Sequence, residues 1–177
     1  MSATTLCRLG IDKTSIRTFG NVTQFLGKVG PNIFIEVAEH SCIFRSLTDS
    51  NQSFGCCKLD REFFNLYESP SNTIRCKLPV KCFIAAFKNL KNVTDMELTF
   101  MKGRVESVLV FKLQSIMGIV KNYKFCIEEC DIMEALFDTR LAVNKLVCGS
   151  QKLSGIFTHM HGSVEVAMQL GTQHLRV

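Results

Sequence analysis

Apolar residues along the chain alternate between a spacing of two, typical of strands, and a spacing of three or four, typical of helices. Residues 5–11 alternate in part, which predicts a strand. The apolar positions that follow, centred on Phe19, recur at helical spacing and predict a helix over residues 14–29. Gly30 and Pro31 end this helix, since glycine favours the C-terminal cap and proline cannot continue the helix.

Three further strands and a short helix are predicted after this first helix. The strands cover residues 32–37, 41–47 and 53–59. Residues 60–67 open with acidic side chains, which are favourable at a helix N-terminus. The chain therefore begins with a unit of strand, helix, three strands and short helix.

The same unit recurs, because the first strand begins at residue 5 and its counterpart at residue 73, a separation of 68 residues. The elements predicted in this second copy are a strand at 73–78, a helix at 79–91, strands at 96–100, 105–113 and 119–127, and a short helix at 128–137. A third copy begins with a strand at 143–148, a helix at 150–160 and a strand at 163–170.

This duplication predicts an α+β fold. One pair of units would form a domain at 1–137, in which two long helices cover one face of a large antiparallel sheet. Residues 138–142 would link it to a second domain of the same kind, begun at 143–177 but incomplete.

The first long helix is predicted to turn basic side chains away from the sheet. With Phe19 as the core direction, Arg17 and Lys28 point roughly 160–180° away at about 100° per residue. Lys13 lies just before this helix.

The second long helix has the same bias. With Phe83 as its core direction, Lys81 and Lys88 both point away and share one face, while Lys91 lies on the flank. Neither helix has an acidic residue between its caps. Two interpretations follow, a solvated charged face or a surface that attracts phosphates.

The overall charge does not decide between them. The 177 residues include 21 Lys and Arg against 16 Asp and Glu, a net charge of +5, so only the placement of charge can argue for nucleic acid. Binding through phosphates alone would depend on salt and ignore sequence. We expect no aromatic side chain among these basic residues, which argues against base stacking.

Cysteine usage indicates a reducing compartment. The nine cysteines are odd in number and irregularly spaced, and several, such as Cys82 and Cys126, take positions suited to apolar residues. Zinc is the alternative, but the close pairs lack the CxxC spacing of a tetrahedral site; they are Cys56-Cys57, Cys126-Cys130, His40-Cys42 and His159-His161. No cofactor or metal is expected.

Neither a transmembrane helix nor secretion is expected. No 18-residue window is free of charge, and the N-terminus lacks the apolar stretch of a signal peptide.

Four segments carry a family resemblance: RCKLPVKCFIAAFKNL (75–90), CIEECDIMEALFD (126–138), FGCCKLDREFFNLYES (54–69) and LVCGSQKLSGIF (146–157). Their order and spacing, over residues 5–170, resemble the Rad-nine type subunit of the checkpoint (nine-one-one) DNA sliding clamp, a relative of proliferating cell nuclear antigen.

The resemblance implies a nuclear, non-enzymatic clamp that encircles DNA, signals damage and supports repair. It implies a heterotrimer with subunits of Rad-one and Hus-one type, and a clamp loader as a further partner. Helices line the inside of such a ring, which assigns to the DNA side Arg17, Lys28, Lys81, Lys88 and Lys91. The edge strand of the first domain, which would pair with a neighbouring subunit, is expected within 105–113.

Two departures from the family leave alternatives open. The second domain stops early and the long phosphorylated tail is absent, so a fragment, a short isoform or a diverged lineage is expected. The first alternative is an interaction module that binds clamp subunits without encircling DNA. The second is a 3′–5′ exonuclease, which needs converging carboxylates. Its acidic candidates, most of them in first turns of short helices, are Asp60, Glu62, Glu128, Glu129, Asp131 and Glu134.

Overall fold

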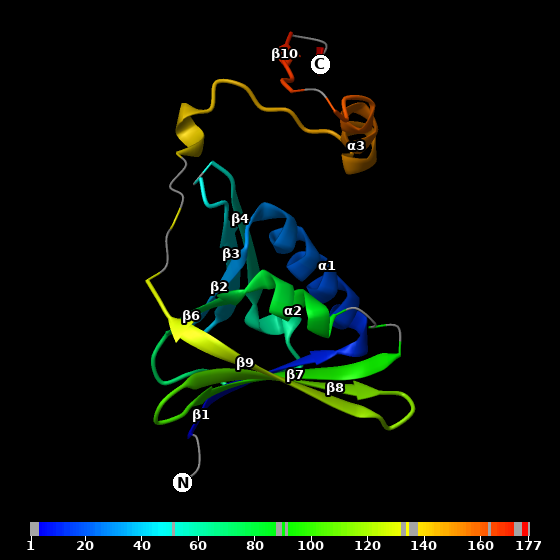
Figure 1. Ribbon diagram of the computed structural model, residues 1–177. Coiled ribbons are helices and arrows are strands. Elements are labelled where there is room, and N and C mark those ends of the chain that lie inside the picture. Colours follow the sequence, from blue (N-terminus) through cyan, green and yellow to red (C-terminus); the bar gives the residue numbers. More distant parts are fainter. Residues whose placement is uncertain are drawn as a thin grey trace. The chain divides into compact units, whose positions relative to one another are not determined.

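Nine strands hydrogen-bond into one antiparallel sheet in the first unit of the chain, and helices α1 and α2 lie on one of its faces (Figure 1). The computed structural model describes residues 4–50, 52–87, 90, 92–131, 134, 138–162, 164–171 and 175–176. The chain divides into two units, Met1–Glu134 and Ala135–Val177.

The first unit contains two copies of one series of elements. The first copy comprises β1 (Thr4–Asp12), α1 (Lys13–Val29), β2 (Asn32–Val37), β3 (Ser41–Leu47), β4 (Phe54–Asp60), the 3₁₀ turn η1 (Arg61–Phe63) and β5 (Leu66–Tyr67). The second comprises β6 (Ile74–Pro79), α2 (Val80–Ala86), β7 (Val93–Lys102), β8 (Ser107–Ser115) and β9 (Val120–Glu129).

Each copy gives its first strand to the other copy. β1 pairs with β7, and β6 pairs with β2, so the sheet order is β4-β3-β2-β6-β9-β8-β7-β1-β5. The first strand of each copy therefore finds its main neighbour in the other copy. The predicted α+β fold, with two helices on one face of an antiparallel sheet, is confirmed.

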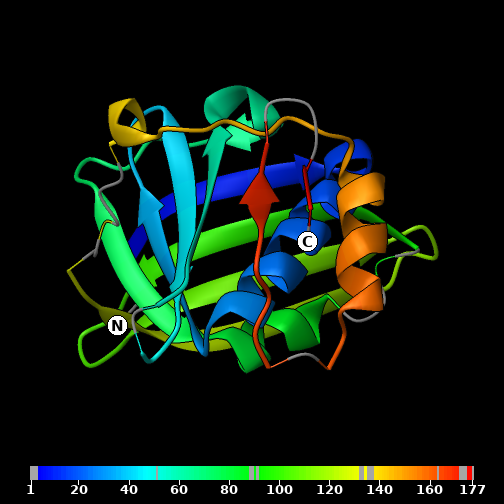
Figure 2. The same cartoon turned by 90° about the horizontal axis from the view of Figure 1, so that it is seen from above.

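Aromatic rings fill the space between the helices and the sheet. Phe19 of α1 contacts Phe44 of β3, with ring centroids 5.4 Å apart. Phe83 of α2 contacts Phe111 of β8 at 5.0 Å. Apolar side chains from the helices and the sheet surround these rings, and the core is continuous across both copies. Figure 2 shows both helices crossing the strands of the sheet.

The prediction of a short helix after the last strand of each copy, at 60–67 and at 128–137, is wrong. Residues 60–67 form the one-turn η1 and then β5, because the backbone of Asn65 and Glu68 donates to the carbonyls of Gly10 and Arg8 on β1. In the second copy, Glu128 and Glu129 continue β9 and pair with Lys77 and Cys76 of β6. Residues 132–133 and 135–137 lie outside the described residues.

The helix predicted at 79–91 ends earlier, since α2 covers Val80–Ala86 and Phe87 caps it with its backbone N–H bonded to the carbonyl of Ile84. Residues 88–89 and 91 lie outside the described residues.

The prediction that the edge strand lies within 105–113 is also wrong. β8, which covers that segment, pairs with β7 on one side and β9 on the other. β9 pairs with β8 along Val120–Ile127, whereas its other side meets β6 only at its last two residues. Among the described residues, no strand pairs with the outer backbone of β9 before Glu128 or with the outer backbone of β4 at the end of the sheet, so both are open edges there.

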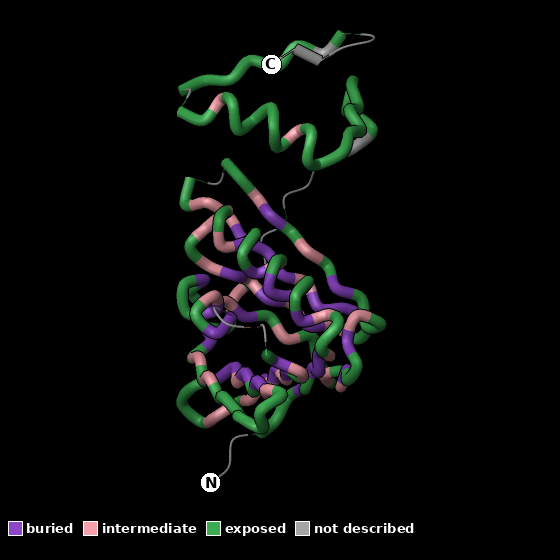
Figure 3. Tube along the Cα trace, turned by 90° about the vertical axis from the view of Figure 1, so that its right-hand side faces the viewer, coloured by how far each residue is buried: buried purple, intermediate pink, exposed green. Residues whose placement is uncertain are grey.

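The second unit contains η2 (Thr139–Leu141), α3 (Ser150–His159) and a ribbon of β10 (Gln169–Leu170) with β11 (Leu175–Arg176). The helix predicted at 150–160 is present. The strand predicted at 143–148 is absent, and that at 163–170 shrinks to β10, because the described residues offer neither segment a longer strand to pair with. Figure 3 shows exposed residues almost throughout this unit. No described helix is long and apolar enough to cross a membrane.

We expect Phe19→Ala to destabilise the protein by about 3–5 kcal/mol, because it removes a fully buried ring from the aromatic core. The matched control is Phe25→Ala on the same helix, where the side chain is 50% exposed, and its cost should stay below about 1 kcal/mol. Urea denaturation followed by circular dichroism measures both. Similar losses of stability for the two variants would contradict the assigned core.

Candidate nucleic-acid interface

Asp12 sets where helix α1 begins. Its Oδ1 accepts hydrogen bonds from the Thr14 hydroxyl at 2.7 Å and from the Ser15 backbone N–H at 3.0 Å. The Thr14 bond, and then the Ser15 bond, stabilise the carboxylate and hold the pKa of Asp12 below its ordinary value. The cap starts the helix at Lys13, so Lys13 and Arg17 stand in its first two turns.

Two glycines let α2 pack closely along α1. A β-carbon at Gly20 would lie 2.8 Å from Leu90 Cδ1, and one at Gly27 would overlap Ile84 Cδ1. Gly27 also faces Val80 at the start of α2, whereas Gly20 faces a residue beyond its end, so the chain directions are opposed. This close approach brings the exposed sides of the two helices onto one surface.

Three of the five predicted DNA-facing residues are exposed on these two helices. Arg17 and Lys28 stand on α1, and Lys81 stands in the first turn of α2. Lys28 follows Gly27 directly, so it lies near the first turn of α2. The structure says nothing of Lys88 and Lys91, which lie outside the described residues.

Most cations on the strands have carboxylate partners, whereas within the described part of the chain the cations at α1 and α2 have none. The exceptions on the strands are Lys112, Lys121 and Lys124 of β8 and β9, which form no ion pair with a described residue. Carboxylates form ion pairs with these strand cations: Arg8, Arg45, Lys58, Arg75, Lys77 and Lys102. Within the described residues, no ion pair involves the cations at the helices, which are Lys13, Arg17, Lys28 and Lys81. The helix side therefore holds positive charge that no described carboxylate neutralises.

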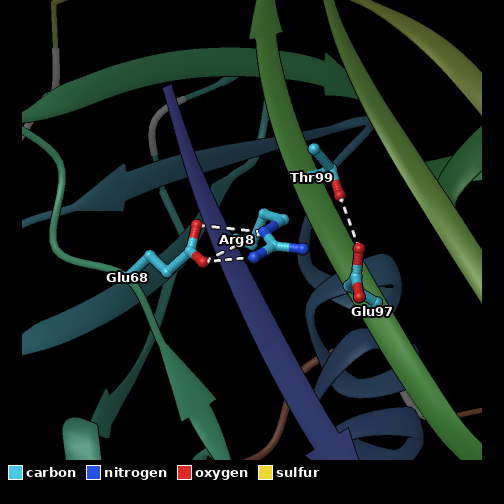
Figure 4. A network of polar contacts seen from close by, with 4 residues as sticks. All are labelled: Arg8, Glu68, Glu97 and Thr99. Carbon is cyan, nitrogen blue, oxygen red and sulfur yellow. Dashed lines mark hydrogen bonds and ion pairs between the residues drawn. The ribbon is translucent and has the colours of Figure 1, made fainter. Parts of the chain in front are cut away.

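Figure 4 shows one of the neutralised cations. Arg8 Nε on β1 donates to both carboxylate oxygens of Glu68, at 3.1 and 3.0 Å. These hydrogen bonds lower the pKa of Glu68 and raise that of Arg8. Since its guanidinium is already paired, Arg8 is a poor site for a phosphate. Figure 4 also shows β7, on which the Thr99 hydroxyl donates to Glu97 Oε1 at 3.1 Å.

One aromatic side chain accompanies the basic residues, contrary to expectation. Phe25 is 50% exposed on α1, at roughly 60–80° from Lys28 and Arg17 around the helix at about 100° per residue. Its ring lies over β4, where a β-carbon at Gly55 would be 3.4 Å from Phe25 Cε1.

The acidic candidates for a nuclease do not converge. Glu128 pairs with Lys77 at 3.1 Å, Glu129 with Lys102 at 3.0 Å and Glu134 with Arg45 at 3.4 Å, so these three carboxylates are held at three different cations. Asp60 similarly pairs with Lys58. Among the described residues, no three His, Cys, Asp or Glu side chains gather as metal ligands. The described part thus offers no ligand set for two-metal hydrolysis.

All nine cysteines are free. Burial raises the pKa of Cys7 and of Cys76 to about 12, so these thiols act as small apolar side chains. Cys82 and Cys126, in contrast, are exposed, and their interpretation as apolar core positions is wrong.

A feature that the sequence reasoning missed lies beside the open edge of β9. A hollow of about 380 Å³ opens there between α2 and the β8–β9 hairpin, and Ala85, Leu113 and Tyr123 are among the residues lining it. Met117 and Ile119 at the hairpin tip are 76% and 53% exposed. The signal was available in the sequence, since a hairpin tip is usually polar and this one is mostly apolar.

Comparison with known proteins assigns the fold and the family. The Rad9 family model matches residues 19–177. The cell cycle checkpoint control protein Rad9 of Drosophila melanogaster is 27% identical over 95 residues, which cover 53% of this chain and 21% of that protein. The DNA repair protein rad9 of Schizosaccharomyces octosporus is 20% identical over 191 residues, which cover 88% of this chain and 44% of that protein.

The crystal structure of PCNA from Thermococcus kodakaraensis has a TM-score of 0.61 at 17% identity, covering 75% of this chain and 51% of that one. This likeness establishes the fold alone. The chain spans less than half the length of the curated relatives it matches.

We expect Asp12→Ala to lower the melting temperature at pH 7, because the first turn of α1 loses its cap. A depressed pKa means that the carboxylate stabilises the fold above its unfolded-state pKa, and that this stabilisation disappears as pH falls through the folded-state pKa. The difference from the native chain should therefore shrink on acidification. Asp12→Asn, which keeps a cap oxygen, should lose less at pH 7. Thermal melts from pH 7 to pH 2 test this, and a destabilisation independent of pH would refute it.

Proposed function

The chain belongs to the Rad9 family, and from this premise we propose that it supplies part of one subunit of a heterotrimeric checkpoint clamp that encircles DNA. Residues 1–137 form the first clamp domain, 138–142 the link and 143–177 the opening of the second domain. The subunit is non-enzymatic and nuclear, is placed on DNA by a clamp loader, and supports checkpoint signalling and repair. Its partner subunits are of Rad-one and Hus-one type.

The observation that carries this proposal is the unneutralised charge on the helix side of the sheet. Arg17, Lys28 and Lys81 are exposed there without a described carboxylate partner, whereas most strand cations are paired. A polyanion gains most from cations that no internal anion already satisfies. Lys88 and Lys91 belong to the same proposed surface by sequence. Cations placed in this way hold phosphates and read no bases, as a sliding ring requires.

We expect Arg17→Glu combined with Lys81→Glu to weaken binding to duplex DNA. The slope of log K against log salt should also become shallower, by about 0.9 for each phosphate that the variant no longer neutralises. Fluorescence anisotropy with a labelled duplex at several salt concentrations measures both quantities. The affinity should fall equally for duplexes of different sequence.

The control for this experiment changes the same amount of charge on the opposite face. Lys112 and Lys124 are exposed on β8 and β9 and alternate with side chains that face the helices, so they point the other way. Lys112→Glu with Lys124→Glu should leave the salt slope unchanged. If the two double variants weaken binding equally, the helix side is not the DNA side.

The open edge of β9 supports pairing with a partner subunit. Its backbone is unpaired along most of one side, and a neighbouring strand would satisfy it. The rings of Tyr123 and Phe125 are stacked with their centroids 6.3 Å apart, and both side chains are only partly buried. Tyr123 also lines the hollow between α2 and the β8–β9 hairpin. An added strand would cover these rings and protect the edge from aggregation.

We expect Met117→Asp combined with Ile119→Asp to weaken binding to the partner clamp subunits at least about tenfold, since both side chains are exposed beside this edge and would be desolvated in the complex. Val105→Asp, at a 93% exposed position in the β7–β8 turn, is the control and should bind normally. Surface plasmon resonance with the purified partners measures the affinity. Unchanged binding of the double variant would remove this edge from the interface.

The second candidate function is an interaction module that binds clamp subunits without encircling DNA, and the β9 edge favours it equally. Pull-down of the partner subunits with and without duplex DNA separates the two. DNA retained only through the Arg17 and Lys81 surface supports the clamp, and partner binding without DNA retention supports the module.

A further inference from the structure

Arg45 lies on the face of the sheet away from the helices, yet its side chain is only 7% exposed. Its neighbour in β3, Phe44, contacts Phe19 of α1 and therefore points toward the helices. Because side chains alternate along a strand, Arg45 points to the opposite face. A guanidinium withdrawn from water in this way needs carboxylates to neutralise it.

Glu36 alone does not provide that neutralisation. Its Oε2 lies 3.0 Å from one Arg45 nitrogen, but its Oε1 also lies 3.9 Å from Arg75. One carboxylate thus faces two guanidinium groups. Glu134, whose Oε1 lies 3.4 Å from the other terminal nitrogen of Arg45, brings the cluster to two positive and two negative charges.

Glu134 follows β9 in the sequence, and β9 is not a neighbour of β3 in the sheet. β9 ends at Glu129, which is paired with Cys76 of β6. β3 lies two strands further along, beyond β2. β3 is thus three strands from β9, and five residues after the end of β9 the chain places a carboxylate about 14 Å across the outer face, at three strand spacings.

We propose that the Arg45–Glu134 ion pair is a latch that holds Glu134, five residues beyond the end of β9, against the outer face of the sheet. The buried guanidinium recruits Glu134 because Glu36 is shared with Arg75. The latch fixes the point from which the chain leaves the first unit, and it is independent of DNA binding by the helix side.

Glu134→Gln tests the latch, since the side chain is 63% exposed and its replacement should not unfold the sheet. Hydrogen exchange of the whole chain, read by mass spectrometry at single residues, should show the amides of Cys130, Asp131 and Glu134 exchanging about threefold faster or more, with those of β3 unchanged. Glu128→Gln is the matched control, because Glu128 pairs with the exposed Lys77 in the same region and should leave exchange of these three amides unaltered.

A second variant, Arg45→Met, keeps the apolar stem and removes the charge, and it should accelerate the same amides. Native exchange in Glu134→Gln would overturn the latch. Equal acceleration by Glu128→Gln and Glu134→Gln would also overturn it, because removing any charge there would then simply loosen the end of β9.

Discussion

Two copies of one unit exchange their first strands, and the arrangement of the first unit depends on this exchange. β1 finds its long partner in β7, and β6 finds its partner in β2, so neither copy can complete its sheet alone. The exchange places α1 and α2 side by side on one face, where Gly20 and Gly27 allow close contact. One aromatic core then serves both copies, with Phe19 and Phe83 facing the strands. The opposite sides of the helices become one surface as a consequence of this packing.

Charge on this protein is informative through its placement. A net charge of +5 is mild for 177 residues. On the strands, carboxylates pair with Arg8, Lys77 and Lys102, among other cations, while the described parts of α1 and α2 carry no acidic side chain beyond the Asp12 cap. The same ion pairs that neutralise the strands also keep the acidic residues apart. The described carboxylates therefore supply no ligand set for two-metal hydrolysis.

The second unit has little strand pairing among its described residues, and helix α3 forms where helical spacing predicts it. Its described residues include none that is buried, and its ribbon is two residues long on each side. A strand gains stability from a partner and a covered face rather than from its own composition. The predicted strand at 143–148 has neither among the described residues.

The spacing of apolar residues alone predicted those helices and strands that have one apolar face and one polar face. Helix α1 was predicted at 14–29 and begins one residue earlier, and β2 has the predicted bounds, because their apolar residues recur at the spacing of a helix and of a strand. β3 also has the predicted bounds, although polar Arg45 and Ser46 are among its buried residues. The outward direction of Arg17, Lys28 and Lys81 followed from the same periodicity.

Tertiary structure decided the features that depend on pairing between segments far apart in the sequence. β1 draws residues 66–67 into a strand, β6 extends β9 through Glu129, and β8 becomes interior while β9 becomes the edge. It also decided that Cys82 and Cys126 are exposed and that Glu134 meets Arg45, because backbone hydrogen bonds and ion pairs between distant segments leave no periodic signal in the chain.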